Sequence, residues 1–320
     1  MNILITGATG FIGRVLTQKL LTETQHELRL PLRNNTLTPE LSSHPKIKIY
    51  QVDDITRETD WRTMLQQCDV VIHLAARVHM MKEHPNMGHA YKELNVAGTM
   101  QLAKQAIDAK VKRFIFISTI KVNGEEQAGG KMYTSEDVPN PQDAYARSKL
   151  KAELKLLSLS KKSNLEVTII RPPLVYGPMV KGNLKTMMHW LKKGLPLPLG
   201  NTGNARSLVS VYNLSDLIIT CMTHPKAANE IFLVSDGKSI STTVLLQKMG
   251  QAMGIPVRLF SLPRGFLSNI LILMRQKATA KRLLGSLELD ISKTQKLLAW
   301  QPKSHLEEVL KSIATQDIRN

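Results

Sequence analysis

MNILITGATGFIG, residues 1–13, opens the chain with an apolar run, a glycine-rich turn and the start of a helical pattern. Residues 2–6 suit a short buried parallel strand, and residues 11–21 have helical apolar spacing. The glycines between and within them are Gly7, Gly10 and Gly13. Such a turn lets backbone N–H groups approach a pyrophosphate, and the helix start adds partial positive charge. The spacing G-x-x-G-x-x-G is a variant of the G-x-G-x-x-G fingerprint and predicts a dinucleotide site.

The composition is that of a soluble globular protein with an unusual excess of positive charge. The 320 residues are 42% hydrophobic and 22% charged, and the net charge is +17. This charge suits an anionic partner. The basic residues are interleaved with acidic ones and form no long block or basic-aromatic repeat, so we expect no nucleic-acid partner.

Cysteines and apolar runs indicate a cytoplasmic protein without stable membrane insertion. Cys68 and Cys221 are far apart and belong to no metal or redox motif, so reduced structural thiols are expected. The first apolar run ends at Thr6, too early for a signal peptide. The longest apolar stretch, residues 266–274, contains Ser and Asn and predicts an amphipathic helix. Core packing or a subunit interface is its expected use, with a membrane-surface role as the alternative.

Strand and helix patterns alternate up to about residue 178, which predicts a doubly wound parallel sheet. Expected strands are 2–6, 26–32, 46–52, 69–74, 112–118 and 166–171, with helices at 11–21, 87–109 and from 144. Beyond 178 the pattern loosens into helices at 182–193, 213–222, 241–253, 292–299 and 306–315 and strands at 206–211 and 231–235. We expect a smaller α/β cap built mainly from residues 179–320, with some later segments returning to the first domain, 1–178.

The end of the second expected strand bears on cofactor choice. An acid there would bind the adenosine ribose, whereas an arginine favours a 2′-phosphate. The chain has Leu32 and Arg33 and no acid, which favours NADP(H) over NAD, unless Arg33 is simply a solvent-facing charge. Two acids, Asp53 and Asp54, follow the third strand on the adenine side.

Thr119, Tyr145 and Lys149 have the residue types and order of a hydride-transfer site. A free tyrosine has a pKa of about 10 and is a poor base. Tyr145 and Lys149 share one helix face, and an ammonium beside the phenol would favour phenolate, as would a cationic nicotinamide. Tyr145 would then act as general acid or base. Thr119, at the end of the fifth strand, is placed to hold the substrate oxygen.

These motifs together resemble the extended short-chain dehydrogenase/reductase family, of the nucleotide-sugar 4-epimerase and 4-ketoreductase type. The matching stretches cover nearly the whole chain: Thr6 to Gly13, Asp53-Asp54-Ile55, His73-Leu74-Ala75-Ala76, Asn95-Val96-Ala97-Gly98-Thr99, Ser118-Thr119, Tyr145 to Lys149 and Arg171 to Pro178. The resemblance implies a Rossmann-type sheet with a nucleotide-sugar-binding cap, a UDP-sugar substrate and a homodimer formed through the helix that bears Tyr145.

The resemblance also implies residue roles. Thr119, Tyr145 and Lys149 would be catalytic. The cofactor, NADP or NAD, would lie against Gly7, Gly10, Phe11, Ile12, Gly13, Arg33, Asp54, Ile55, Leu74, Ala75, Ala76, Asn95, Tyr145, Lys149 and Pro172. The substrate would contact Thr119, Asn183, Leu197, Leu199, Arg206 and Arg282, with Arg206 pairing with phosphate.

Departures from the family pattern narrow the reaction. Dehydratases place Asp-Glu directly after the catalytic Thr, where this chain has Ile120-Lys121, so a dehydratase is not expected. Epimerases with tightly held NAD show an acid at the place of Leu32 and an Asn at that of Leu174. These two departures favour a reductase. Ser118 to Glu125, together with Arg171 to Pro178, resembles enzymes that reduce UDP-4-keto-6-deoxy-N-acetylhexosamines for surface polysaccharide, which is the reaction we expect. The alternative is a UDP-glucose or UDP-N-acetylglucosamine 4-epimerase. A third hypothesis is a non-catalytic cofactor-sensing or nucleic-acid-binding relative.

No metal site is expected. His73, His79, His84 and His89 are close in sequence but lack a spacing that would bring them together.

Overall fold

A parallel seven-stranded sheet forms the centre of the larger domain. The computed structural model describes residues 1–320 except 34–38, 78–86, 128–129, 181, 275 and 320. The strands are β1 Asn2–Thr6, β2 Glu27–Leu32, β3 Ile47–Gln51, β4 Val70–His73, β5 Arg113–Ile117, β6 Glu166–Arg171 and β9 Ile231–Leu233. Their order is β3-β2-β1-β4-β5-β6-β9. The winding reverses between β1 and β4, so the predicted doubly wound sheet is confirmed.

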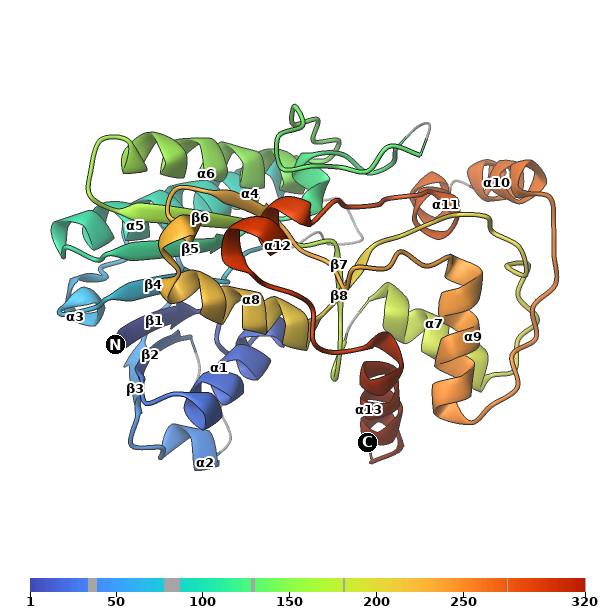
Figure 1. Cartoon of the computed structure of the whole chain (residues 1–320), viewed down its shortest axis with the longest axis horizontal. Coiled ribbons are helices and arrows are strands. Elements are labelled where there is room, and N and C mark those ends of the chain that lie inside the picture. Colours follow the sequence, from blue (N-terminus) through green and yellow to red (C-terminus); the bar gives the residue numbers. More distant parts are fainter. Residues whose placement is uncertain (34–38, 78–86, 128–129, 181, 275, 320) are drawn as a thin grey trace.

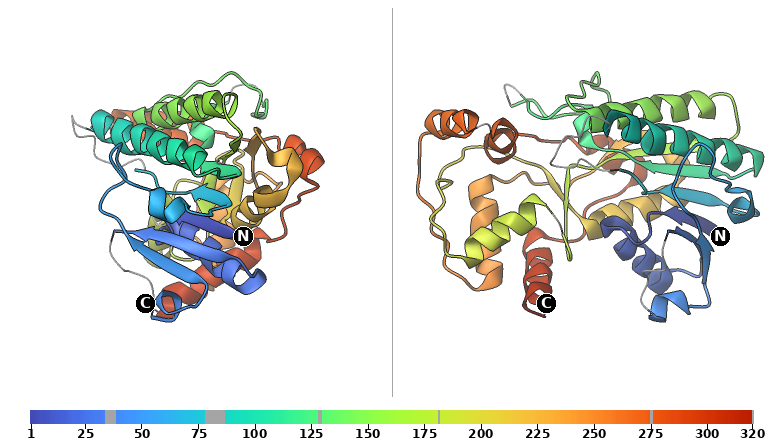
Figure 2. Two further views of the ribbon diagram at one scale, coloured as in Figure 1. Left: turned by 90° about the vertical axis from the view of Figure 1, so that its left-hand side faces the viewer. Right: turned by 180° about the vertical axis from the view of Figure 1, so that it is seen from behind.

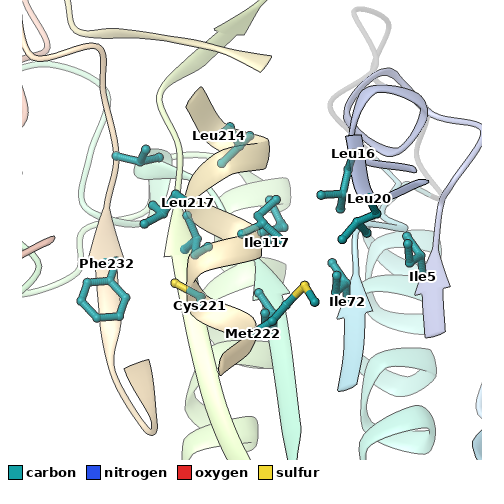
Figure 3. Close-up of a cluster of buried hydrophobic side chains, with 14 of the residues drawn as sticks. Ile5, Leu16, Leu20, Ile72, Ile117, Leu214, Leu217, Cys221, Met222 and Phe232 are labelled. Carbon is teal, nitrogen blue, oxygen red and sulfur yellow. The ribbon is translucent and has the colours of Figure 1, made fainter. Parts of the chain in front are cut away.

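Helices cover both faces of this sheet (Figure 1). On one face α1 Phe11–Glu23 and α8 Val211–Thr223 pack on side chains such as Ile5 and Ile72 (Figure 3). On the other, α5 Thr99–Asp108 and α6 Ala144–Ser160 pack on Leu4 and Val71. Successive residues of β1 point to opposite faces, so a strand buried on both sides reads as the continuous apolar run seen in the sequence.

The remaining elements of the larger domain are short. They are α2 Pro39–Ser42, α3 Arg62–Leu65, α4 Met87–Tyr91, η2 Ile120–Val122, η3 Pro225–Ala227 and α12 Ser292–Leu298. The π-helix η1 Lys92–Gly98 joins α4 to α5, where the sequence predicts one helix over 87–109. A widened helical turn of this kind re-aims a side chain, here that of Asn95, which is buried.

The cap has its own core and a two-stranded parallel sheet. Its elements are β7 Leu174–Tyr176, β8 Leu208–Ser210, α7 Asn183–Lys192, α9 Thr242–Met253, α10 Arg264–Leu273, α11 Lys277–Leu284 and α13 Leu306–Arg319. The expected strand 206–211 is shorter, because the Ser210 hydroxyl accepts from the Asn213 N–H at 3.0 Å and starts α8. β9, α8 and α12 return to the large sheet. In the described part of the chain, no helix is both long and apolar enough to cross a bilayer.

Candidate functional site

The glycine turn lies where the winding of the sheet reverses. Gly7 follows β1 with φ +74°, and a Cβ there would come 2.8 Å from the Ala75 nitrogen. A Cβ on Gly13 would come 2.2 Å from the Gly7 carbonyl oxygen. The chain can make this turn only because these residues lack side chains. The close approach also brings the segment after β4, which contains Leu74, Ala75 and Ala76, against the turn.

The turn fits the diphosphate of a dinucleotide. Gly10 stands at the N-cap of α1 without a side-chain cap, and the first turn of α1 contains no acid. The N–H groups at this helix start therefore have no carboxylate competing for them. The side chains of Phe11 and Ile12 pack into the cap core and the large core, so only their backbone is offered to a ligand.

Gly13→Ala is expected to weaken cofactor binding at least about tenfold and to lower the free energy of unfolding by about 1–3 kcal/mol. The added methyl group would overlap backbone atoms of Gly7 and Ala8, which cannot rotate away. Cofactor titration and urea unfolding measure the two effects. Gly88→Ala is the matched control, because a Cβ at Gly88 meets nothing within 4 Å. If both variants bound cofactor and unfolded alike, the predicted overlap of a methyl group at Gly13 with the backbone would be wrong.

Thr119 is held at the end of β5 by backbone hydrogen bonds of its neighbours. The Ile120 N–H donates to the Pro172 carbonyl at 2.9 Å, and the Ser118 N–H donates to Ile170 at 2.8 Å. The hydroxyl of Ser118 is buried and has no partner among the described residues.

Tyr145 and Lys149 lie on α6, which begins at a well-formed cap. The Asp143 carboxylate accepts from the Ala146 N–H at 2.7 Å. Lys149 lies one turn after Tyr145 and is 1% exposed. Because α6 packs against η2, which follows Thr119, the structure brings the helix with Tyr145 and Lys149 beside the strand end with Thr119.

The protein's own groups raise the pKa of Tyr145. Burial is the main cause, followed by the Asp143 carboxylate and by Tyr91, whose ring centroid lies 6.1 Å away. This direction is opposite to the one that the Tyr-Lys spacing predicts. The Lys149 ammonium lies 3.8 Å from the ring centroid of Phe116, and burial lowers its pKa to about 7. Tyr145 is therefore kept in its protonated form.

Glu153, one turn after Lys149 on α6, forms a buried ion pair with Arg171. The Arg171 guanidinium donates to the Glu153 carboxylate at 2.6, 3.1 and 3.2 Å, and both side chains are almost fully buried. Arg171 also donates to the Asn123 side-chain oxygen at 2.9 Å. Glu153 raises the pKa of Lys149 against the effect of burial. Sequence reasoning missed this pair, although Glu153 lies four residues after Lys149 on the same helix face.

His73 links the glycine turn to the neighbouring helices. Its Nδ1 lies 2.7 Å from the Thr6 hydroxyl, and its Nε2 lies 2.9 Å from the Thr99 hydroxyl. The Thr99 hydroxyl donates to the Asn95 carbonyl, so Nε2 must donate to Thr99 and Nδ1 must accept from Thr6. Burial lowers the pKa of His73 to about 3, which keeps this neutral form.

Asn95 continues this chain of hydrogen bonds to α6, the helix that bears Tyr145. Its amide accepts from the Arg77 N–H at 2.8 Å and donates to the Ser148 hydroxyl at 3.0 Å. The Ser148 hydroxyl donates to the Tyr145 carbonyl at 2.7 Å. The side chain of Asn95 thus holds protein groups in place, and its expected contact with the cofactor stays a prediction.

Arg33 and Asp54, which are predicted to bind the cofactor, lie together after the ends of β2 and β3. The Arg33 guanidinium lies 3.2 Å from the Asp54 carboxylate, and both side chains are mostly exposed, at 73% and 68%. Ile55 packs against Gly98, where a Cβ would come 2.7 Å from its side chain. The strand ends of β2 and β3 therefore present a cation and an acid together, and their roles toward a cofactor stay predictions.

The predicted substrate residues come from several cap segments. Asn183 is the first residue of α7. The side chains of Leu197 and Leu199 are buried in the cap core, so they could meet a ligand only through their backbone. The Leu197 N–H donates to the Arg258 carbonyl at 2.9 Å, which fixes this irregular segment.

Arg206 is half-buried in the cap and is already bonded to the protein. Its guanidinium donates to the Gly285 carbonyl at 2.8 Å. Burial lowers the pKa of Arg206, Glu126 and Glu125 raise it, and Arg282 lowers it. Arg206 therefore interacts with two acids as well as with Arg282, and its pairing with a phosphate stays a prediction.

Lys121 occupies one of the two positions where dehydratases of this type carry acids. Its ammonium lies 2.7 Å from the Asp143 carboxylate and 3.2 Å from that of Glu125. Sequence reasoning identified the absent acids but not this pairing. His79 and His84 lie outside the described residues, and within the described ones no three His, Cys, Asp or Glu side chains gather as a metal site would require.

Known proteins of similar sequence and structure share this architecture. The sequence model of the NAD dependent epimerase/dehydratase family matches residues 3–235. A Vibrio cholerae protein named UDP-glucose 4-epimerase is 43% identical over 98% of this chain and 94% of its own length. Crystal structures of Thermotoga maritima UDP-glucose 4-epimerase with UDP-glucose and of Bacillus cereus UDP-glucuronic acid 4-epimerase with NAD each superpose with a TM-score of 0.78 at 22% identity. They cover 100% and 98% of this chain, and it covers 99% and 96% of theirs. The expected enzyme class and sheet are confirmed, and the chain belongs to the NAD dependent epimerase/dehydratase family.

Proposed function

We propose that this enzyme transfers a hydride between NAD(P) and C4 of a UDP-linked sugar. The observation that carries the proposal is that Thr119, directly before η2, and Tyr145 and Lys149 on α6 lie at the carboxyl edge of the sheet that also bears the glycine turn. Bound nicotinamide supplies or accepts the hydride. Arg206 and Arg282 would bind the diphosphate of the sugar nucleotide.

The chain's own residues would handle the proton at the sugar oxygen. The Thr119 hydroxyl holds O4 in line, and the Tyr145 phenol donates its proton to O4 as C4 receives the hydride. A tyrosine kept protonated by burial is suited to this donor role. Lys149 supplies positive charge near the phenol and would bind the nicotinamide ribose.

The first candidate reaction is net reduction of a UDP-4-keto-6-deoxy-N-acetylhexosamine for surface polysaccharide. Leu32 and Leu174 replace the residues typical of epimerases that retain NAD. Purified enzyme should consume NADPH or NADH with UDP-4-keto-6-deoxy-GlcNAc. If neither cofactor is consumed, this reaction is ruled out.

The second candidate is 4-epimerisation, favoured by the Vibrio cholerae relative and by the two solved 4-epimerases. It requires interconversion of UDP-Glc with UDP-Gal, or of UDP-GlcNAc with UDP-GalNAc, without net change in cofactor absorbance. Sugar analysis by NMR separates the two reactions, because an epimerase reaches a mixture of C4 isomers while a reductase stops when one cofactor per sugar is consumed.

Arg33→Ala is expected to lower kcat/KM for NADPH about tenfold and to change that for NADH less than about twofold, because only NADPH offers a 2′-phosphate to the guanidinium. Initial rates with both cofactors measure the preference. Arg62→Ala is the matched control, since Arg62 is also exposed and paired with an acid, Asp60 at 2.8 Å. Equal losses with both cofactors would leave no support for the NADPH preference.

We also propose a cytoplasmic homodimer. Its support is α6, whose outward face exposes Leu154 at 59% between basic side chains. Cys68 and Cys221 are free and buried, as expected in a reducing compartment.

A further inference from the structure

Five large apolar side chains are exposed at one end of the cap. These residues, which we term the apolar tip, are Phe260, Phe266, Ile272, Leu273 and Met274. They lie within fifteen residues of sequence, and Leu273 is 85% exposed. Exposed apolar side chains are ordinary when single, but a contiguous group marks a surface that binds something.

The helix α10 contains three of these residues, Phe266, Ile272 and Leu273, and its two sides differ. Leu267 is buried and packs into the cap core, and α10 also packs against α11. Phe266 and Leu273 stand seven residues apart, so they lie on one face two turns from each other. Figure 1 and Figure 2 show α10 at the end of the molecule farthest from the large sheet.

Basic residues predominate in the part of the sequence that contains the apolar tip. Residues 237–287 contain eight Lys and Arg and no Asp or Glu. Arg258 and Arg264 are exposed beside the tip, and the acid recorded near Arg264 is Glu126, 3.8 Å away. A second copy of this chain would bring the same basic charge to the contact, so charge complementarity favours an anionic occupant.

We infer that the apolar tip docks on an anionic membrane surface, with α10 lying in the interface and its flanking arginines at the lipid headgroups. An amphipathic helix with basic flanks binds lipid in this way, through buried apolar area and attraction to anionic lipid. At ten residues α10 is far too short to span a bilayer. The inference goes beyond the proposed function, because turnover of a soluble UDP-sugar does not depend on docking.

Vesicle co-sedimentation of the full-length enzyme tests the inference. We expect binding to phosphatidylcholine vesicles containing about 30% phosphatidylglycerol and at least about tenfold weaker binding to phosphatidylcholine alone. Raising the salt from about 50 mM to about 500 mM should weaken binding at least about tenfold by screening. Failure to bind the anionic vesicles at low salt would overturn the inference.

The double variant Phe266→Ser/Leu273→Ser should lower vesicle binding at least about tenfold while kcat/KM in solution stays unchanged. The matched control is Met132→Ser/Val138→Ser, which removes two exposed apolar side chains outside the tip and should bind like wild type. Equal vesicle binding by the tip variant would overturn the inference. So would a smaller sedimentation coefficient of the tip variant in lipid-free solution, which would make the tip an interface between copies.

Discussion

Tyr145→Phe is expected to lower kcat at least about a thousandfold and to leave the cofactor Kd within about twofold. The variant keeps the ring, which packs against Tyr91 at 6.1 Å, and loses only the hydroxyl that would donate to the sugar oxygen. Because the protein raises the pKa of Tyr145, the hydroxyl carries a proton across the neutral range. Without this hydroxyl, a water molecule that no side chain holds in place would have to supply the proton.

Single-turnover absorbance of the nicotinamide measures this effect, and cofactor titration measures the Kd. Tyr91→Phe is the matched control, because it removes a hydroxyl from the neighbouring ring, and it should retain turnover within about threefold. Activity of Tyr145→Phe close to wild type would remove Tyr145 from the mechanism. A wild-type chain that binds cofactor but turns over no UDP-sugar would instead support the non-catalytic hypothesis.

Local patterns predicted the parts of the site that depend on neighbours in sequence. The glycine turn is encoded within thirteen residues, and Tyr145 and Lys149 share a helix face through their spacing. The strand Glu166–Arg171 begins and ends where the pattern places it. Such features follow from backbone geometry, so an apolar run or a glycine spacing suffices to find them.

Contacts between distant residues could not be predicted in this way. His73 meets Thr6 and Thr99 only because β1, β4 and α5 come together in the fold. The bond from Arg206 to the Gly285 carbonyl depends on how α11 ends. Side-chain partners across elements are set by tertiary packing, for which the sequence of one chain offers no periodic signal.

The direction of the pKa shift of Tyr145 also could not be predicted from the spacing of residues in the sequence. Spacing shows that Lys149 is near Tyr145, but it does not show that Phe116 lies under the ammonium or that Asp143 caps the helix. Burial then lowers the pKa of the lysine to about 7. A cation that is close in sequence can thus have less influence on the phenol than the dielectric environment that both groups share.

Glu153→Gln is expected to lower the free energy of unfolding by about 3–5 kcal/mol, because it leaves the Arg171 guanidinium buried without a counter-charge. Arg171 would keep its bond to Asn123, which is neutral and cannot replace the carboxylate. Urea unfolding measures the loss. The double variant Glu153→Leu/Arg171→Met is the control, since removing both charges should recover most of the stability. A single variant within about 1 kcal/mol of wild type would contradict the argument.

The same substitution should shift the pH dependence of catalysis, which separates a role in the site from a role in stability alone. Glu153 raises the pKa of Lys149, so its loss disfavours the ammonium and lowers that pKa further below its ordinary value. Activity that needs a charged Lys149 is lost above this pKa, and the alkaline limit of kcat/KM should therefore move to lower pH. The double variant also lacks Glu153, so it should regain stability yet keep the shifted limit. If the limit instead stays at the wild-type pH in both variants, Glu153 stabilises the fold without tuning Lys149.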